Sequence, residues 1–294
     1  MLELVEVSKV YRGGRRAVDG LTLSLGTGVL GLLGPNGAGK SSLMRVAATV
    51  TRPTSGRVLF DGVDVVARPD ALRRTLGYLP QDFGVHPHLT AREFLAYLAA
   101  VKGLSARSAR TRIPELLELV NLTGAAKRPL GGYSGGMLRR IGIAQALLAD
   151  PRVIIVDEPT AGLDPQERIR FRTLLSDLAV DRAVLVSTHI VSDLETITDD
   201  VAVLAGGRLL HRGSLDRLLD TVAGQVWELT VDPAEVPRLQ AGYRMTRLVR
   251  TASGVRVRVL APGPPDHRAQ AVPPDLEDAY LSMVAASPSP EPVR

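Results

Sequence analysis

The residues with the clearest chemical potential form a glycine-rich stretch, GPNGAGKS, from Gly34 to Ser41. A short apolar run (29–33) precedes it, and apolar residues at helical spacing (43–47) follow it. A strand that breaks into such a loop and then a helix is the context required by the phosphate-binding pattern GxxxxGKS/T. Backbone N–H groups of the loop and the positive end of the helix can surround an anion. Lys40 would then reach the β- and γ-phosphates and Ser41 would bind Mg²⁺. The stretch predicts a nucleotide site in preference to a glycine-rich turn with a chance lysine.

A pair of acids, Asp157 and Glu158, ends the β-branched apolar run 152–156. Such a run is typical of a parallel strand that is buried on both faces. The carboxyl ends of parallel strands are where α/β folds bind ligands. One acid can hold Mg²⁺ and the other can orient water, which are the two acidic roles in nucleoside triphosphate hydrolysis. The phosphate loop upstream favours this interpretation over a solvated strand end.

Three further signals are weaker by themselves. Tyr11, beside a turn upstream of the loop, could stack on a nucleobase or be an ordinary strand-edge tyrosine. Ser134 and the two glycines after it open a helix and could bind an anion. His189 follows an apolar strand and could contact a γ-phosphate or serve the structure only.

Composition limits the class of protein. The 294 residues have room for one large α/β domain and a smaller appendage, and 45% of them are hydrophobic. No apolar run approaches the roughly 18 residues of a membrane span, and the first residues lack the layout of a signal peptide. Cysteine is absent, which excludes disulfides and thiolate metal sites. The net charge is +5, but no basic block interleaved with aromatic residues predicts a nucleic-acid groove.

The hydrophobic periodicity predicts the elements that position these residues. We expect strands or hairpins at 2–7, 21–25, 29–33, 57–65, 76–80, 152–156, 183–187 and 201–211. We expect helices at 90–102, 108–122, 138–149 and 166–178, so that 82–130 is a mostly helical insertion. Beyond these, the pattern predicts a helix at 215–222, strands at 226–231 and 255–259, and a capped amphipathic helix at 275–284. In the strand 255–259, valines alternate with Arg256 and Arg258, which indicates a half-exposed strand.

In this order, several motifs of residues 1–220 resemble the ATP-binding subunit of an ABC transporter. They are GPNGAGKS, Gln81, YSGGM at 133–137, VIIVDE at 153–158, AGLD at 161–164 and His189. YSGGM is decisive, because generic P-loop ATPases lack it between the glutamine and the acidic strand. It differs from the commonest form, LSGGQ, at Tyr133 and Met137, and similar endings occur among subunits that energise exporters with separate permeases. The resemblance implies an α/β P-loop NTPase fold with an antiparallel β subdomain and a helical signature subdomain (about 82–150). It also leaves a small C-terminal α+β accessory domain (221–286) and a disordered tail (287–294).

The resemblance also implies ATP and Mg²⁺ as cofactors and a role for each site residue. Tyr11 would stack on adenine. The phosphates would be held by Gly34, Pro35, Asn36, Gly37, Ala38, Gly39, Lys40, Ser41 and Ser42. Ser41, Gln81 and, through water, Asp157 would serve Mg²⁺. Glu158 would polarise the attacking water, and His189 would contact the γ-phosphate. Ser134, Gly135 and Gly136 would touch the ATP of a partner subunit, and Asp164 would communicate between protomers.

The implied assembly is a head-to-tail homodimer, or a heterodimer with a similar subunit, bound to an integral membrane permease. The chain would be cytoplasmic and peripheral at the inner face of the membrane. It would power export of a drug, antibiotic, lipid or peptide, and the helix at 275–284 resembles the ending of drug- and polymer-exporting subunits. Residues 83–89 could form the floor of a permease groove or an ordinary buried loop. The alternative is a non-transport ABC ATPase acting on DNA or the ribosome. Such relatives carry a long coiled-coil insertion or two nucleotide domains, which this sequence lacks, so we expect no nucleic-acid partner. A kinase or GTPase is disfavoured by YSGGM, AGLD and His189.

Overall fold

The central sheet is built around β3 (Gly28–Leu33), β7 (Val153–Asp157) and β8 (Ala183–Ser187), whose residues are nearly all buried. Successive side chains of a strand point to opposite faces of a sheet. Val153 and Ile155 of β7 therefore pack on one face, while Ile154 and Val156 pack on the other. Burial on both faces explains why the sequence shows a continuous apolar run here instead of alternation.

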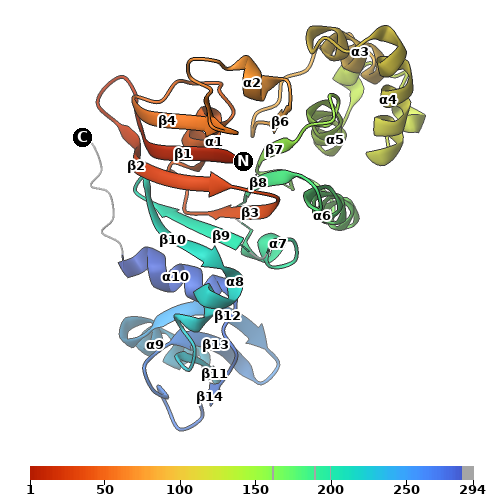
Figure 1. Cartoon of the computed structure of the whole chain (residues 1–294). Coiled ribbons are helices and arrows are strands. Elements are labelled where there is room, and N and C mark those ends of the chain that lie inside the picture. Colours follow the sequence, from red (N-terminus) through yellow and green to blue (C-terminus); the bar gives the residue numbers. More distant parts are fainter. Residues whose placement is uncertain (161, 189, 199, 287–294) are drawn as a thin grey trace.

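The computed structural model describes residues 1–160, 162–188, 190–198 and 200–286, and in this part of the chain it contains three β-sheets (Figure 1). The central sheet has the order β10-β9-β3-β8-β7-β6. It includes β6 (Leu76–Leu79), β9 (Asp200–Ala205) and β10 (Arg208–Ser214). All neighbours pair in parallel except β9 and β10, which form the predicted closing hairpin. The carboxyl ends of β3, β7 and β8 consequently meet at one edge of the sheet.

An antiparallel sheet of order β2-β1-β4-β5 covers the phosphate-loop helix α1 (Lys40–Ala47). Its strands are β1 (Leu2–Val10), β2 (Arg16–Leu25), β4 (Ser55–Phe60) and β5 (Val63–Asp64). Asp61 and Gly62 have φ values of 48° and 79°, which confirms the predicted Asp-Gly hairpin between β4 and β5. Leu43 and Met44 of α1 share one hydrophobic core with this sheet and with one face of the central sheet.

Helices cover the other face of the central sheet. They are α5 (Gly135–Ala146), α6 (Pro165–Ala179) and the short α7 (Val191–Glu195), while α3 (Ala91–Val101) and α4 (Ala106–Leu119) pack on α5. The predicted helical insertion at 82–130 is confirmed, and α3 and α4 form a lobe beside the sheet (Figure 1). The predicted start of the next helix at Leu138 is wrong. Helix α5 begins at Gly135 because the Ser134 hydroxyl caps it, accepting the N–H of Met137 at 3.3 Å. The four-residue helix α2 (Asp70–Arg73) was not predicted.

The C-terminal part contains a separate antiparallel sheet of order β12-β13-β11-β14. Its strands are β11 (Val226–Val231), β12 (Arg244–Thr251), β13 (Gly254–Leu260) and β14 (Gln270–Ala271). Leu229, Val257 and Val259 form its own small core with α9 (Val236–Gly242). The sequence predicts β11 and β13 but not β12, β14 or α9.

The last helix, α10 (Leu276–Ala286), joins the C-terminal part to the rest of the chain. It packs against α7, α8 (Leu215–Asp220) and β12, and Leu276 and Ala279 are fully buried (Figure 1). The prediction that β13 is half exposed is wrong for Arg258, which is only 8% exposed because its guanidinium pairs with Asp278 of α10. The predicted tail 287–294 lies outside the described residues. None of the described helices is long and apolar enough to cross a membrane.

Candidate nucleotide site

The loop between β3 and α1 lies tightly between β2 and the turn that joins β9 to β10. Gly39 has a φ of 106°, and a Cβ there would lie 2.1 Å from the carbonyl oxygen of Ala17. A Cβ on Gly34 would lie 2.5 Å from the carbonyl oxygen of Leu204. Both positions therefore need glycine. This suits a loop whose backbone must approach a phosphate closely.

Lys40 begins α1 and folds over this loop. Its side chain is 7% exposed, and its Nζ donates to the carbonyl oxygens of Gly34 and Pro35 at 2.6 and 3.2 Å. Burial lowers the pKa of Lys40, and the nearby carboxylates of Glu158 and Asp157 oppose that shift. The loop thus presents a buried amine beside two acids that favour its charged form.

A cavity of about 420 Å³ opens at this edge of the central sheet. It is lined by Asn36, Gly37, Ala38, Gly39, Lys40, Ser41, Ser42, Gln81 and Glu158, and also by Arg15, Arg16, Ala17 and Arg45. The fold therefore brings Gln81 and Glu158, which are far apart in sequence, to the phosphate loop. Sequence reasoning missed the three lining arginines. Arg45 could have been found, because it follows Ser41 by four residues and so shares its helix face.

The two acids at the end of β7 are held by β8. Asp157 is 1% exposed, and the Ser187 hydroxyl donates to its Oδ1 at 2.5 Å. Glu158 has a φ of 52°, and its N–H donates to the carbonyl oxygen of Ser187 at 3.1 Å. A positive φ is unfavourable for a residue with a side chain and is typical of a functional position.

Arg139 of α5 was not predicted, although it contacts the backbone of both acids. Its side chain is 8% exposed, and burial lowers its pKa against the opposing effect of Asp157, Glu158 and Asp82. Arg139 is followed directly by Arg140 in the sequence, so no local pattern sets it apart from a solvent-facing arginine.

Tyr11 lies next to the cavity without lining it. Its hydroxyl donates to the Ser42 Oγ at 3.2 Å, which ties the ring to the first turn of α1. The Lys9 amine and the Arg15 guanidinium lie 5.3 and 5.6 Å from the ring centroid. The aromatic face therefore stays close to the phosphate loop with cationic groups beside it.

The signature residues lie apart from this cavity. Among the described residues, Ser134, Gly135, Gly136 and Asp164 do not line it. Ser134 caps α5, and the Asp164 carboxylate caps α6 by accepting the N–H of Glu167 at 2.9 Å. Tyr133 is buried, and its hydroxyl donates to the carbonyl oxygen of Ala125 at 2.7 Å, which gives the departure from leucine a structural reason. His189 lies outside the described residues.

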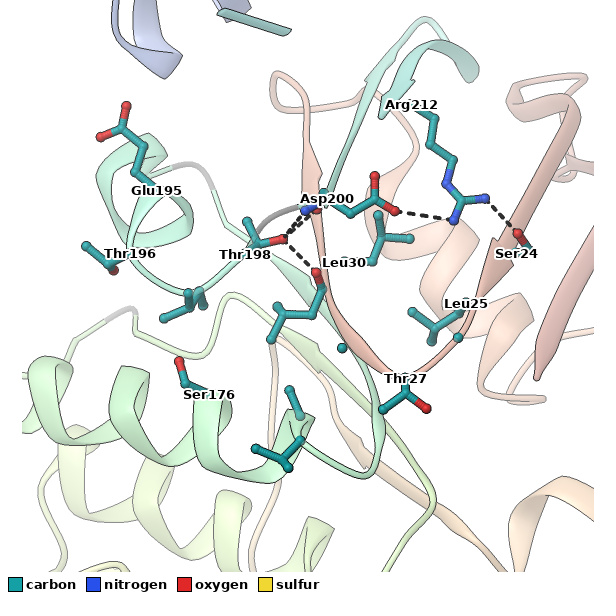
Figure 2. Close-up of a pocket in the computed structure, with 16 residues that line it drawn as sticks. Ser24, Leu25, Thr27, Leu30, Ser176, Glu195, Thr196, Thr198, Asp200 and Arg212 are labelled. Carbon is teal, nitrogen blue, oxygen red and sulfur yellow. Dashed lines mark hydrogen bonds and ion pairs between the residues drawn. The ribbon is translucent and has the colours of Figure 1, made fainter. Parts of the chain in front are cut away.

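A larger hollow of about 510 Å³ lies at the opposite edge of the central sheet, beside the amino end of β3 (Figure 2). Figure 2 shows Arg212 between Asp200 and Ser24, to which it donates at 3.3 and 2.7 Å. The Thr198 hydroxyl donates to the Val29 carbonyl oxygen at 2.6 Å. None of the described residues predicted for nucleotide binding lines this hollow. Because open parallel sheets bind ligands at the carboxyl ends of their strands, the smaller cavity is the candidate nucleotide site.

Comparison with known proteins identifies the family. The model of the family described as "ABC transporter" matches residues 18–161. A Nod factor export ATP-binding protein I from Rhizobium sp. (strain N33) is 35% identical over 298 residues, covering 96% of each chain. The daunorubicin/doxorubicin resistance ATP-binding protein DrrA of Streptomyces peucetius is 37% identical, covering 87% of this chain and 76% of that protein. A dimeric, post-hydrolysis structure of the ATP-binding cassette MJ0796 with ADP and Pi has a TM-score of 0.68 and 27% identity, covering 73% of this chain and 99% of that one. Together with the geometry of the phosphate loop, these similarities establish that the chain is an ATP-binding and ATP-hydrolysing member of the ABC transporter family.

Proposed function

We propose that this chain powers the export of a substrate through a separate membrane permease. The ATP-hydrolysing part of the proposal rests on one observation, the cavity that is lined by the phosphate loop, Gln81 and Glu158. The export part is supported by the Nod factor export relative, whose similarity covers 96% of the chain and so extends through the C-terminal sheet and α10. The drug resistance relative supports the same direction of transport.

In this proposal each residue of the nucleotide site has a separate task. The backbone of residues 34–39 surrounds the phosphates together with Ser42, and Lys40 pairs with their negative charge. Glu158 orients the attacking water, with His189 at the γ-phosphate. Tyr11 stacks on adenine. Catalysis then consists mainly of positioning and charge stabilisation, as phosphoryl transfer requires.

The residues proposed for Mg²⁺ fit that ion. Each of them can offer a side-chain oxygen, the kind of ligand that Mg²⁺ prefers: the hydroxyl of Ser41, the amide oxygen of Gln81 and the carboxylate of Asp157. The hydrogen bond from Ser187 fixes the Asp157 carboxylate, as is usual for groups around a metal. When bound, the ion would supply positive charge that neutralises the phosphates.

For the assembly, we propose a head-to-tail dimer in which Ser134, Gly135 and Gly136 of one chain meet the ATP of the other, with Asp164 at the contact. Their distance from the cavity of their own chain and the dimeric structure of MJ0796 support this arrangement. The permease would bind the helical part (about 82–150), with residues 83–89 near the contact. We retain the division into 1–220 and 221–286, which the separate core of the C-terminal sheet supports.

The catalytic part of the proposal is tested by Glu158→Gln, which keeps the size of the side chain and removes its charge. We expect ATP binding to be retained and nearly all turnover to be lost. An ATPase assay and the binding of the fluorescent analogue mant-ATP measure the two effects. Turnover at the wild-type rate would show that Glu158 is not the base.

The transport part is tested by a detergent pull-down of the tagged full chain from the membranes of its own cell. A polytopic membrane protein recovered in about equal amount would support the exporter. Recovery of ribosomes or DNA without a membrane protein would contradict it and favour the non-transport alternative.

A further inference from the structure

We propose that Arg139 is a positioning residue for ATP hydrolysis, which fixes the backbone of the two acids and of Gln81 relative to helix α5. The inference rests on the catalytic role proposed above for Glu158. Arg139 does not line the nucleotide cavity. It would act through the groups it holds.

The guanidinium of Arg139 contacts two separate segments of the site. In the segment after β6, its Nη1 donates to the carbonyl oxygens of Pro80 and Gln81 at 2.9 and 3.0 Å. From the end of β7, the carbonyl oxygens of Asp157 and Glu158 accept from Nη2, the latter at 2.6 Å. Pro159 accepts from Nε at 3.3 Å. One side chain therefore joins the segment that carries Gln81 to the segment that carries Glu158.

The number of contacts requires arginine. A guanidinium has five N–H donors in a planar fork, and the described residues supply five carbonyl acceptors for them. Lysine carries its three N–H donors on a single nitrogen atom, so it cannot donate to both segments as the planar guanidinium does. An apolar side chain would remove this donor from all five carbonyl groups, three of which accept in buried bonds.

The backbone conformation of Glu158 explains why its contact with Arg139 matters for function. Its φ of 52° persists only where the surroundings hold it. Ser187 holds the N–H side of the residue through its carbonyl oxygen and hydroxyl, and Arg139 holds the carbonyl side. Without Arg139, the peptide after Glu158 loses the donor that α5 supplies, so the carboxylate can leave the orientation that catalysis needs.

Arg139 also links this orientation to the signature residues. It lies on the same helix as Gly135 and Gly136, five residues after the cap Ser134. A rigid shift of α5 therefore moves the guanidinium and, with it, the backbone that carries Gln81 and Glu158. Helix α5, which in the proposed dimer contacts the partner's ATP, is therefore in direct contact with the two acids of its own chain.

The test compares Arg139→Met and Arg139→Lys in the purified full chain. We expect Arg139→Met to lower kcat by about 100-fold, the usual cost of misplacing a catalytic group by about 1 Å. The affinity for mant-ATP should stay unchanged, because Arg139 touches no residue of the phosphate loop. Arg139→Lys should have an intermediate kcat, since it restores part of the donors. Thermal unfolding shows whether each variant is folded.

Arg112→Met is the matched control. Arg112 is a partly buried arginine of α4 that donates to the Leu147 carbonyl oxygen, just beyond α5, at 3.3 Å and does not touch the acids. Its loss should leave kcat and mant-ATP affinity unchanged. A wild-type kcat in folded Arg139→Met would overturn the proposal, as would a kcat that falls only in step with mant-ATP binding. If Arg139→Met does not fold, a wild-type kcat in Arg139→Lys overturns it equally. Glu158→Gln separates the two ideas: if it is inactive while Arg139→Met is fully active, only the role of Arg139 fails.

Discussion

Asp157 and Glu158 are neighbours in sequence, yet different contacts hold them in place. The side chain of Asp157 is fixed by the Ser187 hydroxyl, which leaves its backbone in the regular ladder of β7. Glu158 lies just beyond the strand, and its backbone has left the β conformation. One acid is thus positioned through its carboxylate and the other through its peptide groups. This difference suits a fixed metal ligand on one side and a directed base on the other.

Tyr11 offers a prediction that separates its ring from its hydroxyl. Tyr11→Phe keeps the aromatic face and loses only the half-buried bond to Ser42, so we expect ATP affinity to change by about 1 kcal/mol or less. Tyr11→Ala removes the stacking surface and should lower the affinity about tenfold, since base stacking contributes about 1–3 kcal/mol. Titration with mant-ATP measures both. Equal affinities for Tyr11→Ala and the wild type would contradict the stacking role.

The residues of the nucleotide site divide into those that the sequence could reveal and those that it could not. The phosphate loop and the acids lie in short contiguous motifs, in which local spacing dictates the chemistry. Arg139 contacts residues 58 and 59 positions earlier and 18 to 20 positions later. Only the tertiary packing of α5 on β6 creates those contacts, so no local pattern could predict them.

At the scale of elements, the hydrophobic pattern of the sequence predicted helices and strands correctly where one or both faces of the element are uniformly buried. It failed in the C-terminal part. β12 carries three arginines and has exposed Leu248 and Val249, so its sequence shows no clear alternation. In β13, the alternation of Val and Arg predicts a half-exposed strand, but α10 covers the face that carries Arg258. The cause is Asp278, a carboxylate in a helix 20 residues later, which pairs with that arginine.

The contact between Arg258 and Asp278 predicts a pH-dependent stability of the C-terminal sheet. Burial alone would raise the pKa of Asp278, but hydrogen bonds from Arg258 and Thr246 hold the pKa below its ordinary value of 3.8. A carboxyl group with a lowered folded-state pKa stabilises the fold above its unfolded pKa, and this stabilisation is lost as pH falls through the folded value. Asp275 lies beside the pair, with its Oδ2 at 3.7 Å from Nη2 of Arg258, and it accepts from Arg247 at 2.9 Å. We therefore expect loss of stability below about pH 4, where carboxyl groups of the unfolded chain become protonated.

Asp278→Asn should destabilise the C-terminal sheet by about 3 kcal/mol at neutral pH, because it leaves a buried arginine with weaker partners. The variant should also lose less stability than the wild type when the pH falls below about 4, which is the acid transition of this sheet. Trp227, the chain's single tryptophan, lies in β11 and donates to the Ala261 carbonyl oxygen at 3.0 Å, so its fluorescence reports this sheet. Glu277→Gln is the control, since the partly exposed pair of Glu277 with Arg247 should contribute little. An unchanged acid transition in Asp278→Asn would assign it to other carboxylates.

At the scale of the whole molecule, the two surfaces that we propose to contact nucleotide do not meet within one chain. The phosphate loop, Gln81 and Glu158 line one cavity, while Ser134, Gly135 and Gly136 start α5 outside it. The two surfaces are connected through packing, since α5 packs directly on β6, the strand that precedes Gln81. A chain with one of each can complete both sites only in a symmetric pair, in which each surface faces its complement.

This arrangement makes a prediction for mixed dimers. Lys40→Ala removes the phosphate-loop cation, and Ser134→Arg blocks the signature surface, so each variant alone should lack activity. In a mixed dimer of the two, one site combines both changes and the other combines an intact phosphate loop with an intact signature. Random mixing in equal amounts should therefore restore about a quarter of the wild-type ATPase rate, because half of the dimers have one intact site of two. An ATPase assay before and after mixing measures the gain, and mixing Lys40→Ala with Glu158→Gln is the control, because both changes lie in the same half-site and no intact site can form. No gain with Ser134→Arg would mean that each chain uses its own signature residues, or none, and would contradict the head-to-tail dimer.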